Sequence, residues 1–300
     1  MPSPINLMLT YGLLVFIWAT TPLAIVWSVA DIHPMWTLLF RFLMALPLAV
    51  LILVLLKVKF PTHQSACWSY VAGSLSLIGS QIFTYAATAY LSSGLIALMF
   101  GLAPIIAGLI GRFAYQQKLV AWQWLGMATS IIGLAVICLS GRQQHVQPLG
   151  IALMLLSVFA YAISMFWVKK INADVQPMAQ ATGSILVSTA LALLLLPWIW
   201  QYVPTEVPSS KSLLALCYTV VMASVVAMFC YFKLVQNLQA TTLSLTTVMT
   251  PILAILIGAY LNNEQLSLQV FVGAGIILLG LLLYFFNDIK RYRHIKNPPV

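Results

Sequence analysis

Ten long apolar runs, separated by short polar connections, dominate the sequence. They cover residues 7–29, 36–56, 68–90, 94–111, 122–139, 149–167, 178–200, 213–234, 241–261 and 271–286. Each run is close to the roughly 20 residues that an α-helix needs to cross the hydrocarbon core of a bilayer. A helix of this kind satisfies its own backbone hydrogen bonds in lipid. The sequence therefore predicts an all-α membrane protein with ten transmembrane helices.

Composition excludes a soluble domain. Only 6% of the residues are charged and 62% are hydrophobic, whereas soluble domains carry about 25% charged residues. The net charge of +9 could suggest nucleic-acid binding, but apart from Arg41, and Lys233 at the end of the eighth run, the basic residues lie in the connections and the C-terminal tail. We therefore read them as topology signals for a lipid bilayer and expect no nucleic-acid partner. The four cysteines are widely spaced, so no metal site and no cofactor are expected.

A fixed offset relates the two halves of the chain. It pairs Pro104 with Pro251, Gly111 with Gly258, Gly126 with Gly273 and Gly133 with Gly280, each 147 residues apart. A matching proline and three matching glycines indicate an internal repeat. We expect a first five-helix repeat over residues 1–142, a second over 148–290 and a basic cytoplasmic tail over 291–300.

Basic residues predict the orientation of these repeats. With the N-terminus inside, the inner connections receive nearly all of them, and the outer side receives only Arg142 and Lys211. Both termini are therefore expected to be cytoplasmic. Five helices per repeat is an odd number, so the second repeat should be inverted relative to the first. Inverted repeats with broken helices at matching positions are typical of transporters that work by alternating access.

The two matched prolines lie inside their apolar runs. Proline lacks a backbone donor and clashes with the preceding turn, so Pro104 and Pro251 predict helix kinks. Thr247 and Thr250 are placed either to brace the second kink through the freed carbonyl or to line a pore, and the sequence does not choose between these roles.

Several residues together resemble the EamA-type family of the drug/metabolite transporter superfamily. The matching residues are Trp18, Ala19, Thr20 and Pro22, the pair Arg41 and Phe42, and the series Pro251, Gly258, Glu264, Leu266, Gly273 and Gly280. The chain departs from the family pattern at Asn263, where glycine is expected. Gln117 stands at the first-half counterpart of Glu264. The resemblance implies a ten-helix inner-membrane transporter of small metabolites, often amino acids or amphiphilic compounds.

Arg41 lies inside the second apolar run. A cation at this depth is costly and usually faces a cavity or a partner, although it could also extend to the outer surface. If it faces a cavity, its planar fork suits a carboxylate or phosphate. Gln81 and Tyr85 are four residues apart and share one helix face. The predicted substrate cavity is lined by Trp18, Arg41, Gln81, Tyr85, Phe100, Tyr161 and Thr247, with bends at Pro104 and Pro251.

The acidic residues and histidines lie at the ends of the runs or between them. We therefore expect no proton relay through a buried carboxylate.

The predicted function is secondary transport of a small-molecule substrate, amino-acid-like or amphiphilic, by alternating access and in the direction of efflux, with a monomer as the working unit. A membrane channel or a membrane-embedded enzyme is the alternative. The enzyme would need paired acids, a nucleophile or a metal cluster, and the channel a ring of charges or carbonyls.

Overall fold

The computed structural model describes residues 4–116, 118–139, 147–237, 246–262, 264 and 267–286. In this part of the chain the regular secondary structure is helical, without a β-strand. The predicted all-α fold class is therefore confirmed.

The first half contains α1 (Pro4–Ser28), α2 (Pro34–Leu55), α3 (Gln64–Ser74), the π-helical turn η1 (Leu75–Gly79), α4 (Ser80–Ala87), α5 (Ser93–Phe100), α6 (Ala103–Tyr115) and α7 (Ala121–Cys138). The second half contains α8 (Pro148–Ile171), α9 (Pro177–Leu193), α10 (Leu196–Ile199), the short 3-10 helix η3 (Trp200–Tyr202), α11 (Ser210–Tyr218), the π-helical turn η4 (Thr219–Val226), α12 (Ala227–Asn237), α14 (Thr246–Leu261) and α15 (Leu268–Tyr284). Prolines open α2, α8 and α9, where a missing backbone N–H costs little because the first turn has no acceptor for it.

Among the described residues, six helices are long and apolar enough to span a bilayer. A seventh span results if α9 and the segment Leu196–Tyr202, bent by 51°, are taken together. Val248–Leu261 and Leu268–Tyr284 are shorter apolar helices. Every predicted run contains helix, but the number of ten transmembrane helices stays a prediction.

Contacts of α2 with α9 and with α10, which follows it, show how the halves are oriented. Trp36 Nε1 donates to the carbonyl oxygen of Ile199 at 2.8 Å, and Thr189 Oγ1 donates to that of Phe42 at 3.3 Å. Residue numbers rise along α2 while those of their partners fall, so the second helix of one half runs antiparallel to the second helix of the other.

The fifth helices, α7 and α15, cross at glycines. A Cβ added at Gly126 would lie 2.5 Å from the carbonyl oxygen of Gly280, and one added at Gly133 would lie 2.7 Å from that of Gly273. The order of these pairs is again antiparallel. Corresponding helices thus run in opposite directions, which confirms the predicted inversion of the two halves. Small residues let helices approach closely in lipid.

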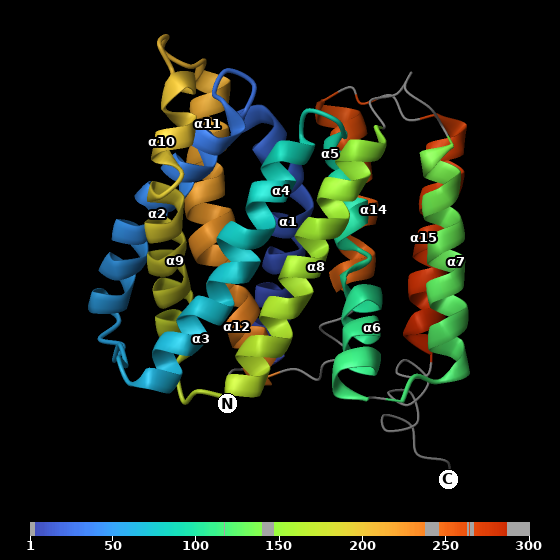
Figure 1. Cartoon of the computed structure of the whole chain (residues 1–300), viewed down its shortest axis with the longest axis horizontal. Helices are drawn as coiled ribbons and strands as arrows, with labels where there is room; N and C mark the ends of the chain where they lie inside the picture. Colours follow the sequence, from blue (N-terminus) through green and yellow to red (C-terminus); the bar gives the residue numbers. More distant parts are fainter. Residues whose placement is uncertain are drawn as a thin grey trace.

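Corresponding helices of the two halves also have corresponding neighbours. α1 packs against α11, η4, α12 and α14, and α8 packs against α3, η1, α4 and α6. Figure 1 shows α7 and α15 as a pair beside the other helices. We call the end that holds the α1–α2 connection the upper end and the end that holds the α2–α3 connection the lower end, as they appear in Figure 1.

Candidate functional site: a cavity around Arg41

A cavity of about 140 Å³ lies between the two halves. Six of the residues singled out from the sequence line it: Trp18, Arg41, Gln81, Phe100, Tyr161 and Pro251. They come from α1, α2, α4, α5, α8 and α14, so both halves contribute to its wall.

Arg41 is the only charged side chain among the residues that line this cavity. It lies seven residues after Pro34, about 10 Å into α2 at 1.5 Å per residue. Its side chain is only 3% exposed, so it does not extend to the outer surface. Nε donates to Ser224 Oγ at 2.9 Å, and Nη1 donates to Gln81 Oε1 at 3.2 Å and to Tyr85 OH at 3.4 Å.

Two π-helical turns place the polar partners of Arg41. In η1, Ser80 N–H donates to the carbonyl of Leu75 five residues back, and Gln81 follows directly. In η4, Ala227 N–H donates to the carbonyl of Met222, and Ser224 Oγ donates to the Thr219 carbonyl at 2.9 Å. Such turns widen an α-helix and occur often at functional sites. Here they lie in corresponding segments of the two halves.

Aromatic rings form much of the remaining wall. The rings of Trp18 and Tyr231 lie 5.5 Å apart, and Phe100 meets Tyr161 edge to face at 6.2 Å. Tyr161 is also hydrogen-bonded to Tyr231. These contacts connect α1 to α12 and α5 to α8, so the apolar wall is built across the two halves.

The other predicted residues take different positions. Tyr85 is fully buried and reaches the site only through its hydrogen bond with Arg41. The side chain of Thr247 lies outside the described residues, whereas its neighbour Thr250 lines the cavity. Thr250 Oγ1 is buried and has no hydrogen-bond partner in the described part of the chain, so it does not brace the Pro251 kink.

The two matched prolines also differ. Pro104 does not line the cavity. It stands in the first turn of α6, after a break at Gly101 and Leu102 that separates α6 from α5. α14, in contrast, continues as helix through Pro251. The first repeat therefore interrupts its helix where the second keeps it.

Contacts between the halves gather at the upper end of the molecule. Trp27 Nε1 of α1 donates to Asn262 Oδ1 at 2.8 Å. Glu264 accepts hydrogen bonds from the backbone N–H of Ser93 at 3.1 Å, from Ser93 Oγ at 2.7 Å and from the N–H of Gly94 at 3.3 Å. Glu264 thus caps α5 of the other half, where the helix dipole favours a negative charge.

Asp31 adds a further connection at this end. Its carboxylate accepts hydrogen bonds from Ser209 Oγ, from the Ser209 backbone N–H at 3.0 Å and from Ser212 Oγ at 2.7 Å. These bonds, the one from the Ser209 side chain above all, hold the pKa of the Asp31 carboxyl below its usual value. The α1–α2 connection is thereby joined to the start of α11.

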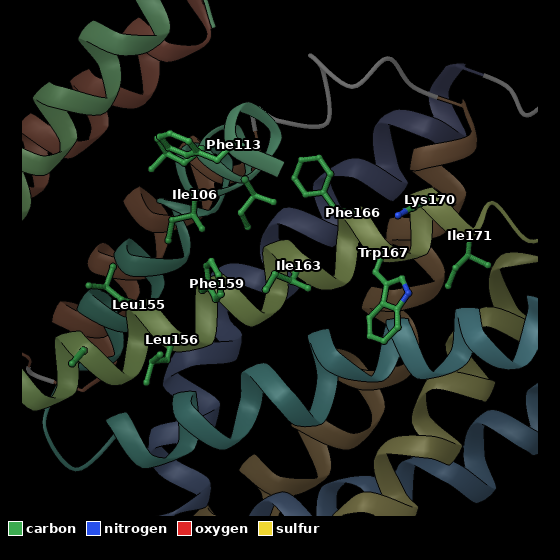
Figure 2. Close-up of a pocket in the computed structure, with 13 residues that line it drawn as sticks. Ile106, Phe113, Leu155, Leu156, Phe159, Ile163, Phe166, Trp167, Lys170 and Ile171 are labelled. Atoms are coloured by element: carbon green, nitrogen blue, oxygen red, sulfur yellow. The ribbon is translucent and has the colours of Figure 1, made fainter. Parts of the chain in front are cut away.

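A groove of about 1310 Å³ lies between α6 and α8. Its lining runs along most of α8, from Ala152 near the start of the helix to Ile171 at its end. Figure 2 shows Ile106 and Phe113 of α6 across from Phe159 and Ile163 of α8, with Lys170 toward the end of α8. Phe113 is 77% exposed. Ala103 of α6 and Tyr161 of α8 line the cavity, whereas Ile106 and Phe159, within one turn of them, line the groove.

Sequence reasoning did not find Ser224, Asn262 or the partners of Glu264. Ser224 is one hydroxyl in an apolar run, and nothing in its neighbourhood marks it. Its partner Arg41 is 183 residues away, so only the tertiary fold brings the two together.

The sequence model of the EamA-like transporter family matches residues 7–139 and again residues 148–286. The chain belongs to the EamA-like transporter family. As a member of it, the chain is a multi-pass membrane protein of a class that moves solutes. The double match reflects the two halves that the offset of 147 residues and the antiparallel helix pairs reveal.

Relatives of this EamA-like chain share its length. It is 25% identical over 271 residues to the uncharacterized inner membrane transporter YedA of Escherichia coli strain K12, covering 90% of this chain and 87% of that one. It is 25% identical over 285 residues to protein PagO of Salmonella typhimurium, covering 93% and 92%. A crystal structure of a protein superposes with a TM-score of 0.68 at 17% identity, covering 96% of this chain and 99% of the other. At that identity the likeness concerns the fold alone.

Proposed function

We propose that this protein is a secondary transporter that carries a small organic solute through the cavity around Arg41 by alternating access. The observation that supports this most is the position of the cavity between two inverted halves, which are hydrogen-bonded to each other at the upper end and leave a groove between α6 and α8.

A comparison of corresponding interfaces in the two halves strengthens the proposal. In the internal repeat, the interface of α1 with α14 corresponds to the interface of α8 with α6. The first is held at the upper end by the hydrogen bond between Trp27 and Asn262, which is 2.8 Å long. The second contains the groove between α6 and α8. One of these two corresponding interfaces is thus hydrogen-bonded and the other is separated by a groove. If the first separated and the second came together, the cavity would open at the upper end. Rocking of one half against the other accomplishes such an exchange in transporters built from inverted repeats.

We propose the inner membrane as the location, with both termini and the lower end in the cytoplasm. Lys57, Lys59, Lys169 and Lys170 lie at the lower end, and Lys211 at the upper end. This distribution follows the rule that cytoplasmic segments are rich in lysine and arginine. The described state would then accept solute from the cytoplasm, and we propose export as the direction of transport.

The size of the cavity limits the substrate. Its volume of about 140 Å³ is close to that of an engineered cavity of about 150 Å³ that holds benzene. The cavity therefore suits a small metabolite, amino-acid-like or amphiphilic, rather than a drug-sized compound. The described residues that line the cavity all come from one chain, and we propose a monomer as the working unit.

Single cysteines test access to the cavity from each side. In a background without the four native cysteines, Thr21→Cys places a thiol in the cavity. Lys59→Cys and Val207→Cys, both at exposed positions, mark the lower and upper ends. Membrane-impermeant maleimide is added to right-side-out spheroplasts and to inside-out vesicles. We expect Lys59→Cys to react only in vesicles and Val207→Cys only in spheroplasts.

Thr21→Cys should react mainly in vesicles and at a slow, finite rate in spheroplasts. Equally fast reaction on both sides, together with single-channel conductance in planar bilayers, would identify a channel and contradict the proposal. The reverse pattern of the two marker cysteines would contradict the proposed orientation alone.

A further inference from the structure

The charge of Arg41 is not neutralised within the described part of the chain. Its three hydrogen-bond partners, Ser224, Gln81 and Tyr85, are all uncharged. The described acidic residues lie in connections near the ends of the molecule: Asp31, Asp174, Glu206 and Glu264. An unpaired cation at this depth costs several kcal/mol, and charged groups within a membrane usually pair with one another or mark a substrate path.

The free donors of Arg41 face the cavity. Nε and Nη1 are used by the protein, while Nη2 has no hydrogen-bond partner among the described residues. Nη2 is not among the buried polar atoms that lack a partner, so it is accessible from the cavity that Arg41 lines. A guanidinium held on one side by Ser224 and Gln81 presents its remaining N–H groups in a fixed direction, which is the arrangement that carboxylates and phosphates bind.

We propose that the substrate is a small monocarboxylate without an ammonium group, bound through its carboxylate to Arg41 Nη2. This inference rests on the proposed function and specifies its substrate class. One cation neutralises one negative charge, so a phosphate dianion would keep an uncompensated charge in a site of mainly apolar walls. The residues that line the cavity include no carboxylate, so the ammonium group of an amino-acid zwitterion would have no anionic partner.

The rest of the cavity suits the apolar part of such a solute. Trp18, Phe100 and Tyr161 supply aromatic walls. The buried, unpartnered hydroxyl of Thr250 belongs to the same wall and can donate to the second carboxylate oxygen after a change of its side-chain rotamer. The volume of about 140 Å³ restricts the solute to an acid whose apolar part is no larger than benzene.

Three matched probes separate charge from shape. Isocaproate is a monocarboxylate, isocaproamide is its neutral amide, and leucine is the same carbon skeleton with an added ammonium group. Binding to the full-length protein in lipid nanodiscs is measured by isothermal titration calorimetry near neutral pH. Counterflow of each labelled probe into preloaded liposomes is measured in parallel, with dye retention as the check on vesicle integrity.

We expect isocaproate to bind at least about tenfold more tightly than isocaproamide or leucine, as a charge-assisted pair in an apolar site implies. Arg41→Gln should abolish that preference, and Arg41→Lys should retain part of it, because lysine keeps the charge without the planar fork. The matched control Arg112→Gln removes an exposed cation at the end of α6 and should leave the preference unchanged.

Two results overturn the inference, and they differ in what they say of transport. If isocaproamide or leucine shows saturable binding and counterflow at least equal to isocaproate, and Arg41→Gln does not alter the order, the carrier proposal stands and the monocarboxylate is wrong. The second result is that intact, folded protein shows no counterflow of any of the three probes and that isocaproate binding does not depend on Arg41. In that case the transport proposal loses its support as well.

Discussion

The indole Nε1 of Trp27 donates a hydrogen bond of 2.8 Å to Asn262 Oδ1. The two residues are 235 positions apart in the chain, and their contact joins the end of α1 to the end of α14. Asn262 also donates through Nδ2 to Glu264 Oε1 at 3.1 Å, so the contact extends to the carboxylate that caps α5. The two halves are thus joined at the upper end by a short series of bonds, and each bond can be removed separately.

Trp27→Phe retains an aromatic ring but removes the indole donor. A hydrogen bond contributes about 1 kcal/mol net, so the population open at the upper end should increase roughly fivefold. The measurement is the rate at which maleimide labels Thr21→Cys in spheroplasts. Trp198→Phe, at a tryptophan that is 70% exposed, serves as the control and should not change this rate. An unchanged rate in Trp27→Phe would show that this bond does not hold the upper end closed.

Glu264→Gln retains the size of the side chain and removes its charge. The bonds to Ser93 and Gly94 would lose their charge assistance and the favourable interaction with the helix dipole. We expect a loss of about 1–2 kcal/mol in the free energy of unfolding, read as a lower Tm in detergent. Glu206→Gln, in an exposed connection, should leave the Tm unchanged. Equal Tm values for the two variants would argue against a capping role.

Gly126→Ala tests the crossing of α7 and α15. The added Cβ would lie 2.5 Å from both the Gly280 carbonyl oxygen and the Tyr284 backbone nitrogen, so the helices must separate, at a cost of about 1–3 kcal/mol or more. Gly275→Ala on α15 is the matched control, because its Cβ would meet nothing within 4 Å. Its Tm should stay constant or rise, since alanine favours helix by about 1 kcal/mol over glycine. Similar effects of both substitutions would contradict close packing at Gly126.

The pKa of Asp31 is lowered in the folded protein by its bonds to Ser209 and Ser212. A carboxyl with a lowered folded pKa stabilises the protein above its unfolded pKa, about 3.9, and this contribution is lost as the pH falls through the folded value. The Tm of the wild type should therefore fall more steeply below about pH 4 than that of Asp31→Asn. Parallel Tm profiles of the two proteins from neutral to acidic pH would contradict this role of Asp31.

Transport should not depend on a proton relay through the protein. The described acidic residues and histidines lie in the connections rather than in the helices around the cavity, and proton-coupled transporters keep such groups within the membrane. After subtraction of the uptake into protein-free liposomes, which accounts for passive entry of the neutral acid, accumulation of isocaproate should be the same with and without a gradient between about pH 7 and pH 8. Uptake against a concentration gradient that requires the pH difference would overturn this expectation.

The repeat could be predicted because proline and glycine mark positions with strict backbone demands, and those positions coincide at one offset. The antiparallel contacts of α2 with α9 and of α7 with α15 confirm its inverted form. For Arg41 the sequence left two positions open, facing a cavity or extending to the outer surface, and the structure places it inside, where it lines the cavity. Its role in substrate binding stays a prediction.

Other features could not be predicted, because they depend on residues far apart in the chain. Ser224 reaches Arg41 only through the π-helical turn η4, and the shape of that turn depends on how its neighbours pack. Glu264 caps α5 across 171 positions of sequence. Pro104 predicted a bend like that at Pro251, yet the preceding Gly101 and Leu102 break the helix instead.

The crossing of α7 and α15 has a consequence for how the protein is made. Gly126 and Gly133 match a surface that is supplied only by α15, the last described helix to leave the ribosome. During translation α7 enters the bilayer before α15 has been synthesised, so its glycine face has no packing partner at that stage. The first half therefore cannot complete its packing on its own. A chain truncated before Leu268 should therefore remain an incomplete assembly and be degraded by membrane proteases.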